Sequence, residues 1–270
     1  MSSAEEMRKS WMRLCKDPRT TVALLENAAY WESINQPRTV EIRLAVARHR
    51  STPSELLTKL SMTNNLSIQI AVAGHPNLSE ATAGKLLKKH LRELRRALAG
   101  NPKAPVFAME KLTRDFKDVR VRLAKNPSLP PKLMKRLAGQ KEWEVRMAVA
   151  QNSNIHSSLL ELLSRDKDES VRAKVAQHYK TPVGGLKALA VDASQKVREI
   201  VFERALEEYP SNKSLFEALT KVKPSLLAQQ AQDHLKMLEE REKEMRKAAA
   251  RLEALGDVSD NDPPENEPED

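Results

Sequence analysis

A short motif recurs through this chain at a nearly constant step of 26 residues, and no other feature constrains the fold as much. The clearest copy is VRMAVAQN at 145–152. Counted by the arginine of the motif, or by the residue in its place, the copies stand at Arg43, Gln69, Arg95, Arg120, Arg146, Arg172 and Arg198. The spacings are 26, 26, 25, 26, 26 and 26 residues. Seven units at this step predict a repeat protein.

Each unit carries the signals of two short helices. The small apolar run of the motif ends in a turn such as Asn126-Pro127. A helix start such as Thr52-Pro53 follows, because Pro is tolerated in a first helical turn and Thr or Ser can cap it. Leucines spaced i, i+1, i+4, as in LMKRL at 133–137, then form a one-sided apolar stripe. One unit cannot bury this stripe alone, so the units are expected to stack into an all-α solenoid.

The consensus Val-Arg-x-Ala-Val-Ala-x-Asn-Pro-x-Thr-Pro-x-x-Leu-Leu resembles the variant leucine-rich repeat, a short relative of the HEAT and armadillo α-solenoids. The resemblance covers residues 38–205. It implies a right-handed α-solenoid of about seven 26-residue units, in which an α-helix alternates with a shorter helix of the α or 3₁₀ type. One member type of the family carries a Cys-ligated iron–sulfur cluster. Only Cys15 stands ahead of the repeats here, so no cofactor is expected.

The repeated arginine also resembles the HEAT ladder, in which an Asp stands six residues before an Arg. Asp166 with Arg172 and Asp192 with Arg198 match that spacing. We interpret the arginines as a structural ladder that pairs with Asp or with helix-end carbonyls between units. Its members are Arg43, Arg95, Arg120, Arg146, Arg172 and Arg198.

The sequence divides into four parts. Residues 1–36 are expected to form an N-terminal cap, and the solenoid repeats occupy 37–222. Trp11, Tyr30 and Trp31 lie in the cap, either to seal the first unit or as an exposed docking patch.

A long charged helix is expected over 223–255. It is either a solvated helix that packs only its first half on the solenoid or a short coiled coil. The coiled coil would make an oligomer through residues 224–255. The last part, 256–270, is acidic with three Pro, and it is expected to be disordered.

Several classes of protein are excluded or disfavoured. A single cysteine rules out a disulfide framework. No apolar run is long enough to span a bilayer, and the start of the chain lacks a secretory signal, so a cytoplasmic protein is expected. His49, His75 and His178 share one repeat position with several Asn residues, which indicates a turn role rather than a metal site. No catalytic motif is present, and we expect no enzyme activity. HEAT-like solenoids do include alkylpurine DNA glycosylases, but Trp143 aligns with a linker rather than with a cleft.

Positive charge is concentrated in the middle of the chain. The whole sequence has 46 Lys and Arg against 37 Asp and Glu, and seven of these acids lie in the last 15 residues. Between Lys85 and Lys141 there are 17 basic and four acidic residues. The spacing predicts a basic stripe, with Lys85 to Arg96 along one helical side. Its candidate binding residues are Lys85, Lys88, Lys89, Arg92, Arg96, Lys132, Lys135 and Arg136.

Two functions are consistent with these features. The first is a protein-binding scaffold or adaptor that uses the solenoid surface, and the alternative is a nucleic-acid-binding protein that uses the basic middle repeats. Solvated helix faces would explain the same charges. The only rings in the basic segment are Phe107 and Phe116, which disfavours single-strand binding by stacking. The acidic tail is an additional contact element, or it folds over the basic stripe and screens it.

Overall fold

The computed structural model describes residues 3–34, 40–222 and 225–256. In these residues all regular secondary structure is α-helical, in seventeen helices, and no strand occurs. The expected all-α class is therefore confirmed. The predicted disordered acidic tail, 256–270, lies outside the described residues from position 257 onward.

The chain forms two compact units, with the division between Lys180 and Thr181. The first unit contains α1 to α13, and the second contains α14 to α17. The residues 37–222, predicted as one run of repeats, are thus distributed over both units.

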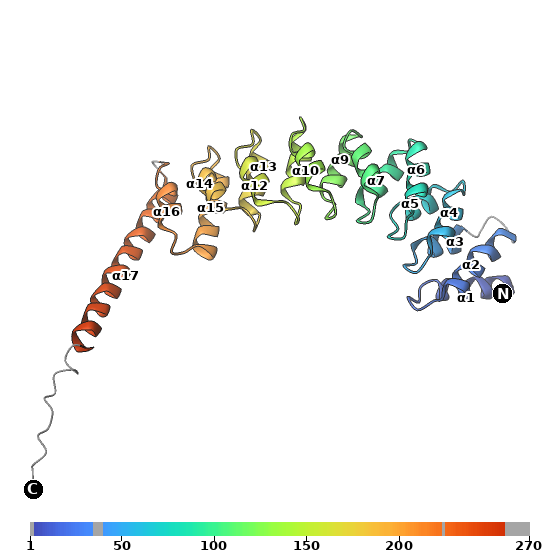
Figure 1. Cartoon of the computed structure of the whole chain (residues 1–270), viewed down its shortest axis with the longest axis horizontal. Helices are drawn as coiled ribbons and strands as arrows, with labels where there is room; N and C mark the ends of the chain where they lie inside the picture. The colour runs from blue at the N-terminus through green and yellow to red at the C-terminus, as the bar shows by residue number, and fades with distance from the viewer. Residues whose placement is uncertain (1–2, 35–39, 223–224, 257–270) are drawn as a thin grey trace, which may run out of the picture. The chain divides into compact units, whose positions relative to one another are not determined.

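The described residues 40–222 form seven successive helix pairs, one for each copy of the motif. We call the first helix of each pair the A helix and the second the B helix. The A helices of the first unit are α3 (Val40–Arg48), α5 (Leu66–Ala73), α7 (Arg92–Gly100), α9 (Lys117–Ala124), α11 (Trp143–Ala150) and α13 (Glu169–Gln177). Each of these packs on the next (Figure 1), so that they form one continuous layer.

The B helices form the second layer of the first unit. They are α4 (Ser54–Ser61), α6 (Glu80–Lys88), α8 (Val106–Leu112), α10 (Pro131–Ala138) and α12 (Ser157–Leu163). Helix α4 packs on α6, α6 packs on α8, and α10 packs on α12. Two layers of stacked helices with one pair per repeat are the expected solenoid.

The repeated apolar residues form a core shared between units. In α11 the side chains of Val145, Val149 and Ala150 are fully buried, because positions three to five residues apart lie on one helix face. In the B helix α10, Leu133 and Leu137 are buried on the facing side. Each such Leu or Val stabilises the fold by about 1.5–3 kcal/mol. Because every unit supplies the same positions, neighbouring units bury one another's stripes.

The helix types and helix starts differ from the sequence expectation in two ways. Both helices of each unit in the first part are α-helices of seven to nine residues, so the second helix is not a 3₁₀ helix. Pro53, Pro105 and Pro130 are N-cap residues with extended backbone rather than first-turn residues. Thr52 does not cap α4, because its hydroxyl donates to Val46 O at 2.6 Å, at the end of the preceding helix.

Two helices precede the first repeat. They are α1 (Ser3–Leu14) and α2 (Val22–Ile34), and both pack on α3. Cys15 and Leu25 are buried, Trp11 is half-buried, and Tyr30 is 68% exposed. The side chain of Trp31 lies outside the described residues.

The second unit contains α14 (Val183–Ala190), α15 (Gln195–Glu208), α16 (Lys213–Leu219) and α17 (Leu226–Gly256). Helix α15 is 14 residues long, unlike the A helices before it. Arg204 stands where earlier units have the turn residue Asn or His, and it pairs with Glu208 at 2.6 Å, so the helix continues. The fully buried Phe216 ring packs edge-on against Phe202, with centroids 6.3 Å apart.

Helix α17 has 31 residues and confirms the predicted long C-terminal helix. Ala228, Ala231 and Leu238 are buried, and the helix packs on α15 and α16 (Figure 1). From Glu239 to Glu253 every side chain is exposed. None of the described helices is both long enough and apolar enough to cross a bilayer.

Candidate binding surfaces

One polar position per unit joins each repeat to the repeat before it. The amide nitrogen of Asn126 donates to Asn101 O and to Ala99 O, both at 2.9 Å. Its Oδ1 accepts the backbone N–H of Ser128 at 2.9 Å. Asn101 and Asn152 make the same set of bonds one unit on either side. These amides connect units rather than only shaping a turn.

Histidine replaces Asn at this position without changing the pattern. The Nε2 of His75 donates to His49 O at 2.8 Å, and its Nδ1 accepts the N–H of Asn77 at 3.0 Å. His49 and His178 make equivalent bonds. The ring must be neutral with its proton on Nε2 to make both bonds. Burial is the main reason that the pKa of His75 lies below its ordinary value.

The repeated arginines form a second ladder, and it runs across units. The carboxylate of Asp166 is bonded by Arg146 of the preceding unit, with N···O distances of 2.6 and 2.8 Å. Arg172, six residues after Asp166, instead donates to the backbone carbonyl of that residue at 2.8 Å. The HEAT-like spacing therefore marks a backbone contact within a unit. The carboxylate contact lies 20 residues downstream of the arginine.

Other rungs follow this geometry with different partners. Arg95 pairs with Asp115, and Arg120 bonds Gln140 Oε1 at 2.6 Å and the carboxylate of Glu142 at 2.8 Å. Gln69, at the arginine position, donates to Thr63 O. Arg146 and Asp166 are the most buried of these pairs, each with a side chain 6% exposed. Burial opposes ionisation of Asp166, but the hydrogen bonds from Arg146 outweigh it and hold the pKa of Asp166 below its ordinary value.

The outer side of the A helices carries exposed apolar residues in register. We define the A-helix face by the positions three before and one after the repeated arginine, which lie one turn apart. Its apolar members are Val40, Leu44, Leu66, Ile70, Val121, Trp143 and Met147. Val40, Leu66 and Trp143 are each between 37% and 39% exposed, and the others are half-buried. The middle of this face is occupied by Arg92, Arg96 and Lys117.

Charges on the A-helix face are paired between units. Arg92 bonds Asp118 at 2.8 Å and lies over the ring of Phe116. Lys117 bonds Glu144 at 2.7 Å. Hydrogen bonds from these cations lower the pKa values of Asp118 and Glu144. The A-helix face thus combines apolar side chains with largely neutralised charges.

The outer side of the B helices is different, because it is strongly basic. Lys59, Lys85, Lys111 and Arg136 occupy one repeat position on α4, α6, α8 and α10, and all four are exposed. We call these four residues the basic column. Lys88, Lys89, Arg114, Lys132 and Lys135 flank the column and are also exposed. Across the described residues, no ion pair involves any of these nine cations.

The structure divides the predicted basic stripe between the two layers. Lys85 and Lys88 lie in α6, Lys89 ends it, and Lys132, Lys135 and Arg136 lie in α10. Arg92 and Arg96 begin a new helix, α7, in the other layer, so Lys85 to Arg96 do not share one helical side as expected. Sequence reasoning missed Lys59, Lys111 and Arg114. The repeat register would have found them, because Lys59, Lys85, Lys111 and Arg136 are spaced 26, 26 and 25 residues apart.

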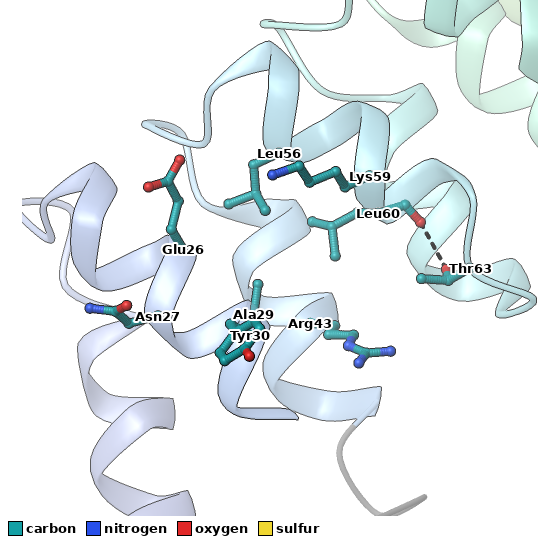
Figure 2. A pocket seen from close by; sticks show the side chains of 9 residues that line it. All are labelled: Glu26, Asn27, Ala29, Tyr30, Arg43, Leu56, Lys59, Leu60 and Thr63. Carbon is teal, nitrogen blue, oxygen red and sulfur yellow. Dashed lines mark hydrogen bonds between the residues drawn. The ribbon is translucent and has the colours of Figure 1, made fainter. Parts of the chain in front are cut away.

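A surface pocket of about 470 Å³ lies at the first repeat (Figure 2). Glu26 and Tyr30 of α2 stand on one side, and Arg43 and Lys59 stand on the other. The hydroxyl of Thr63, at its edge, donates to Leu60 O at 2.8 Å. Nowhere in the described part of the chain do three His, Cys, Asp or Glu side chains gather as a metal site would need.

Comparison with known proteins places this arrangement beside one repeat architecture. A solved structure described as a leucine-rich repeat variant with a novel repetitive protein structural motif matches with 22% sequence identity and a TM-score of 0.49. The match covers 74% of this chain and 82% of that chain. No family model matches the sequence, and no curated protein does. The chain is thus similar to a leucine-rich repeat variant, which is the resemblance its sequence shows.

Proposed function

We propose that this chain is a non-catalytic scaffold or adaptor that binds a protein partner through the A-helix face. The observation that carries the proposal is the row of exposed apolar side chains on that face, in register from one repeat to the next. Val40, Leu66 and Trp143 keep between 37% and 39% of their surface exposed. A stacked helical repeat offers such a row as one extended binding surface.

The side chains that recur in every unit support the same conclusion. The Asn and His residues and the ladder arginines form hydrogen bonds between repeats, which makes them structural. The residues that differ from unit to unit lie on the outer faces, where they can specify a partner. The coarse conclusion, that a repeat fold of this kind suggests a binding scaffold, follows from the architecture alone.

The chemistry of the A-helix face fits a protein rather than a polyanion. Its cations Arg92 and Lys117 are already paired with Asp118 and Glu144. Trp143 is an aromatic side chain of the type that dominates binding energy at protein interfaces, and Met147 lies one turn away from it. We expect the partner to bury Trp143 in an apolar pocket.

The test is a pull-down from native lysate with the full chain, divided into nuclease-treated and untreated halves. We expect one or two protein partners that survive nuclease and that are lost with Trp143→Ala. Loss of a central aromatic anchor weakens binding by about 2 kcal/mol or more, or roughly thirtyfold in affinity.

The matched control is Leu162→Ala, which removes a 61% exposed apolar side chain from the B helix α12. This variant should retain the partner. Partners that disappear with nuclease, or that are lost equally in both variants, would remove the A-helix face as the binding surface.

A further inference from the structure

We propose that the basic column on the B helices is a second binding site, which takes the phosphate backbone of double-stranded nucleic acid without reading its sequence. The site is separate from the A-helix face, because the two lie on different helix layers of the first unit. The proposal therefore does not depend on the protein-binding role.

The repeat architecture sets the spacing of the column. Lys59, Lys85, Lys111 and Arg136 each stand on a different B helix at the same repeat position. Stacked helices are about 8–10 Å apart, so four cations extend over about 25–30 Å. A duplex carries one phosphate charge per roughly 1.7 Å of its axis, so each cation of such a row can meet a phosphate.

The charges of this surface are not neutralised by carboxylates. The described segments 54–62, 80–89, 106–114 and 131–139 expose nine Lys and Arg and only three acids, Glu55, Glu80 and Glu110. Arg136 bonds the hydroxyl of Thr113 at 3.4 Å, and Lys89 bonds Ser61 O at 3.4 Å, which leaves both charges uncompensated. The cations of the A-helix face, by contrast, are paired with Asp118 and Glu144.

The types of residue favour a duplex over the other polyanions. Seven of the nine cations are lysines, which are depleted in protein interfaces but act as point charges toward phosphate. The only ring in these segments is Phe107, which packs over Gly84, where an added Cβ would lie 3.9 Å from the ring. No aromatic platform is therefore available for the stacked bases of a single strand.

The test measures binding of the full chain to a fluorescent 24-base-pair duplex of mixed sequence, by anisotropy. Four phosphate contacts predict that affinity falls by about 100-fold between 50 and 200 mM salt. The triple variant K85Q/K111Q/R136Q should bind at least tenfold more weakly at 50 mM salt. Its logarithmic salt slope should be shallower by about three. All three residues are exposed, and circular dichroism checks that the variant keeps its helices.

The matched control is R96Q/R122Q/K125Q, which removes the same charge from α7 and α9 in the other layer, where all three side chains are exposed. It should bind the duplex within about threefold of the unaltered chain. Equal weakening in the two triple variants would overturn the assignment to the B helices.

The choice of ligand has its own arms. Tighter binding of a single strand of the same length would overturn the duplex. Displacement of the duplex by polyglutamate at an equal charge concentration would replace it with an acidic protein. Trp143→Ala should leave duplex binding unchanged, so loss of this site and loss of the proposed protein-binding site are separately visible.

Discussion

The side-chain amide of Asn126 donates to the backbone carbonyl of Asn101, its counterpart one repeat earlier, at 2.9 Å. Asn101 in turn donates to His75 O, and His75 donates to His49 O. This chain of bonds is buried, and it fixes the register of each unit on the one before it. A repeat protein of this kind therefore holds its units together by polar as well as apolar contacts.

Asn126→Ala is expected to destabilise the first unit by about 2–4 kcal/mol, because it leaves buried carbonyls at Ala99 and Asn101 without a donor. Asn126→His should recover most of this loss, since His49 and His75 make the same kind of bonds. Denaturant unfolding followed by circular dichroism gives the midpoints. Asn154→Ala is the control, because Asn154 is exposed and its amide makes one bond, to Pro127 O. An equal shift for Asn154→Ala would mean that burial of the ladder is not what stabilises it.

Removing Asp166 is expected to be costly because it leaves the buried guanidinium of Arg146 without its carboxylate. Asp166→Ala should lower stability by about 3–5 kcal/mol. Glu144→Ala, which breaks the exposed pair with Lys117, should have a far smaller effect. Unfolding of both variants at neutral pH checks this. Similar midpoints for the two would contradict a special role for the buried rung.

Stability is expected to fall as the pH drops below about 6.5, the ordinary pKa of histidine. The folded-state pKa of His75 is lowered, so the unfolded chain takes up a proton before the folded chain does. Stability from this group is complete above pH 6.5 and is lost as the pH falls toward the folded pKa. Thermal unfolding between pH 5 and 8 should show a shallower decline for His75→Asn, which keeps the bonds without titrating. An unchanged profile would assign the pH dependence to other groups.

Removal of residues 243–270 is expected to leave the stability of the second unit nearly unchanged. The truncated part of α17 makes no buried contact among the described residues, because burial on this helix ends at Leu238. The pair of Lys213 with Glu242 is kept. Leu238→Ala, by contrast, should cost about 2 kcal/mol. Calorimetry of the truncated and full chains tests this, and a large loss on truncation would show that the distal helix packs on something.

The repeat period predicted much of the fold correctly. The spacing of Arg43 to Arg198 located seven helix pairs, and the leucine pattern identified the buried side of each B helix, as at Leu133 and Leu137. These features are local, since the period of the apolar residues and the turn residues are written within each unit. The long C-terminal helix followed from its own three-to-four-residue spacing.

Contacts between units were harder to predict. Asp166 lies six residues before Arg172, yet its carboxylate bonds Arg146 of the preceding unit. Spacing along the chain does not say which of two neighbouring units an acid faces. The basic residues show the same difficulty, because Lys89 and Arg92 are close in sequence but belong to different layers.

The sequence by itself determined the helical class, the number of units and the residues that each unit buries, because these depend on periodicity within a unit. The tertiary structure alone decided the partners across units, such as Asn126 with Asn101 and Arg146 with Asp166. It also decided that Lys59 and Arg136 share one surface, while Arg92 lies on another. The physical reason is that stacking brings together residues one repeat apart, and the direction of each side chain relative to its neighbouring unit is set by how the helices pack.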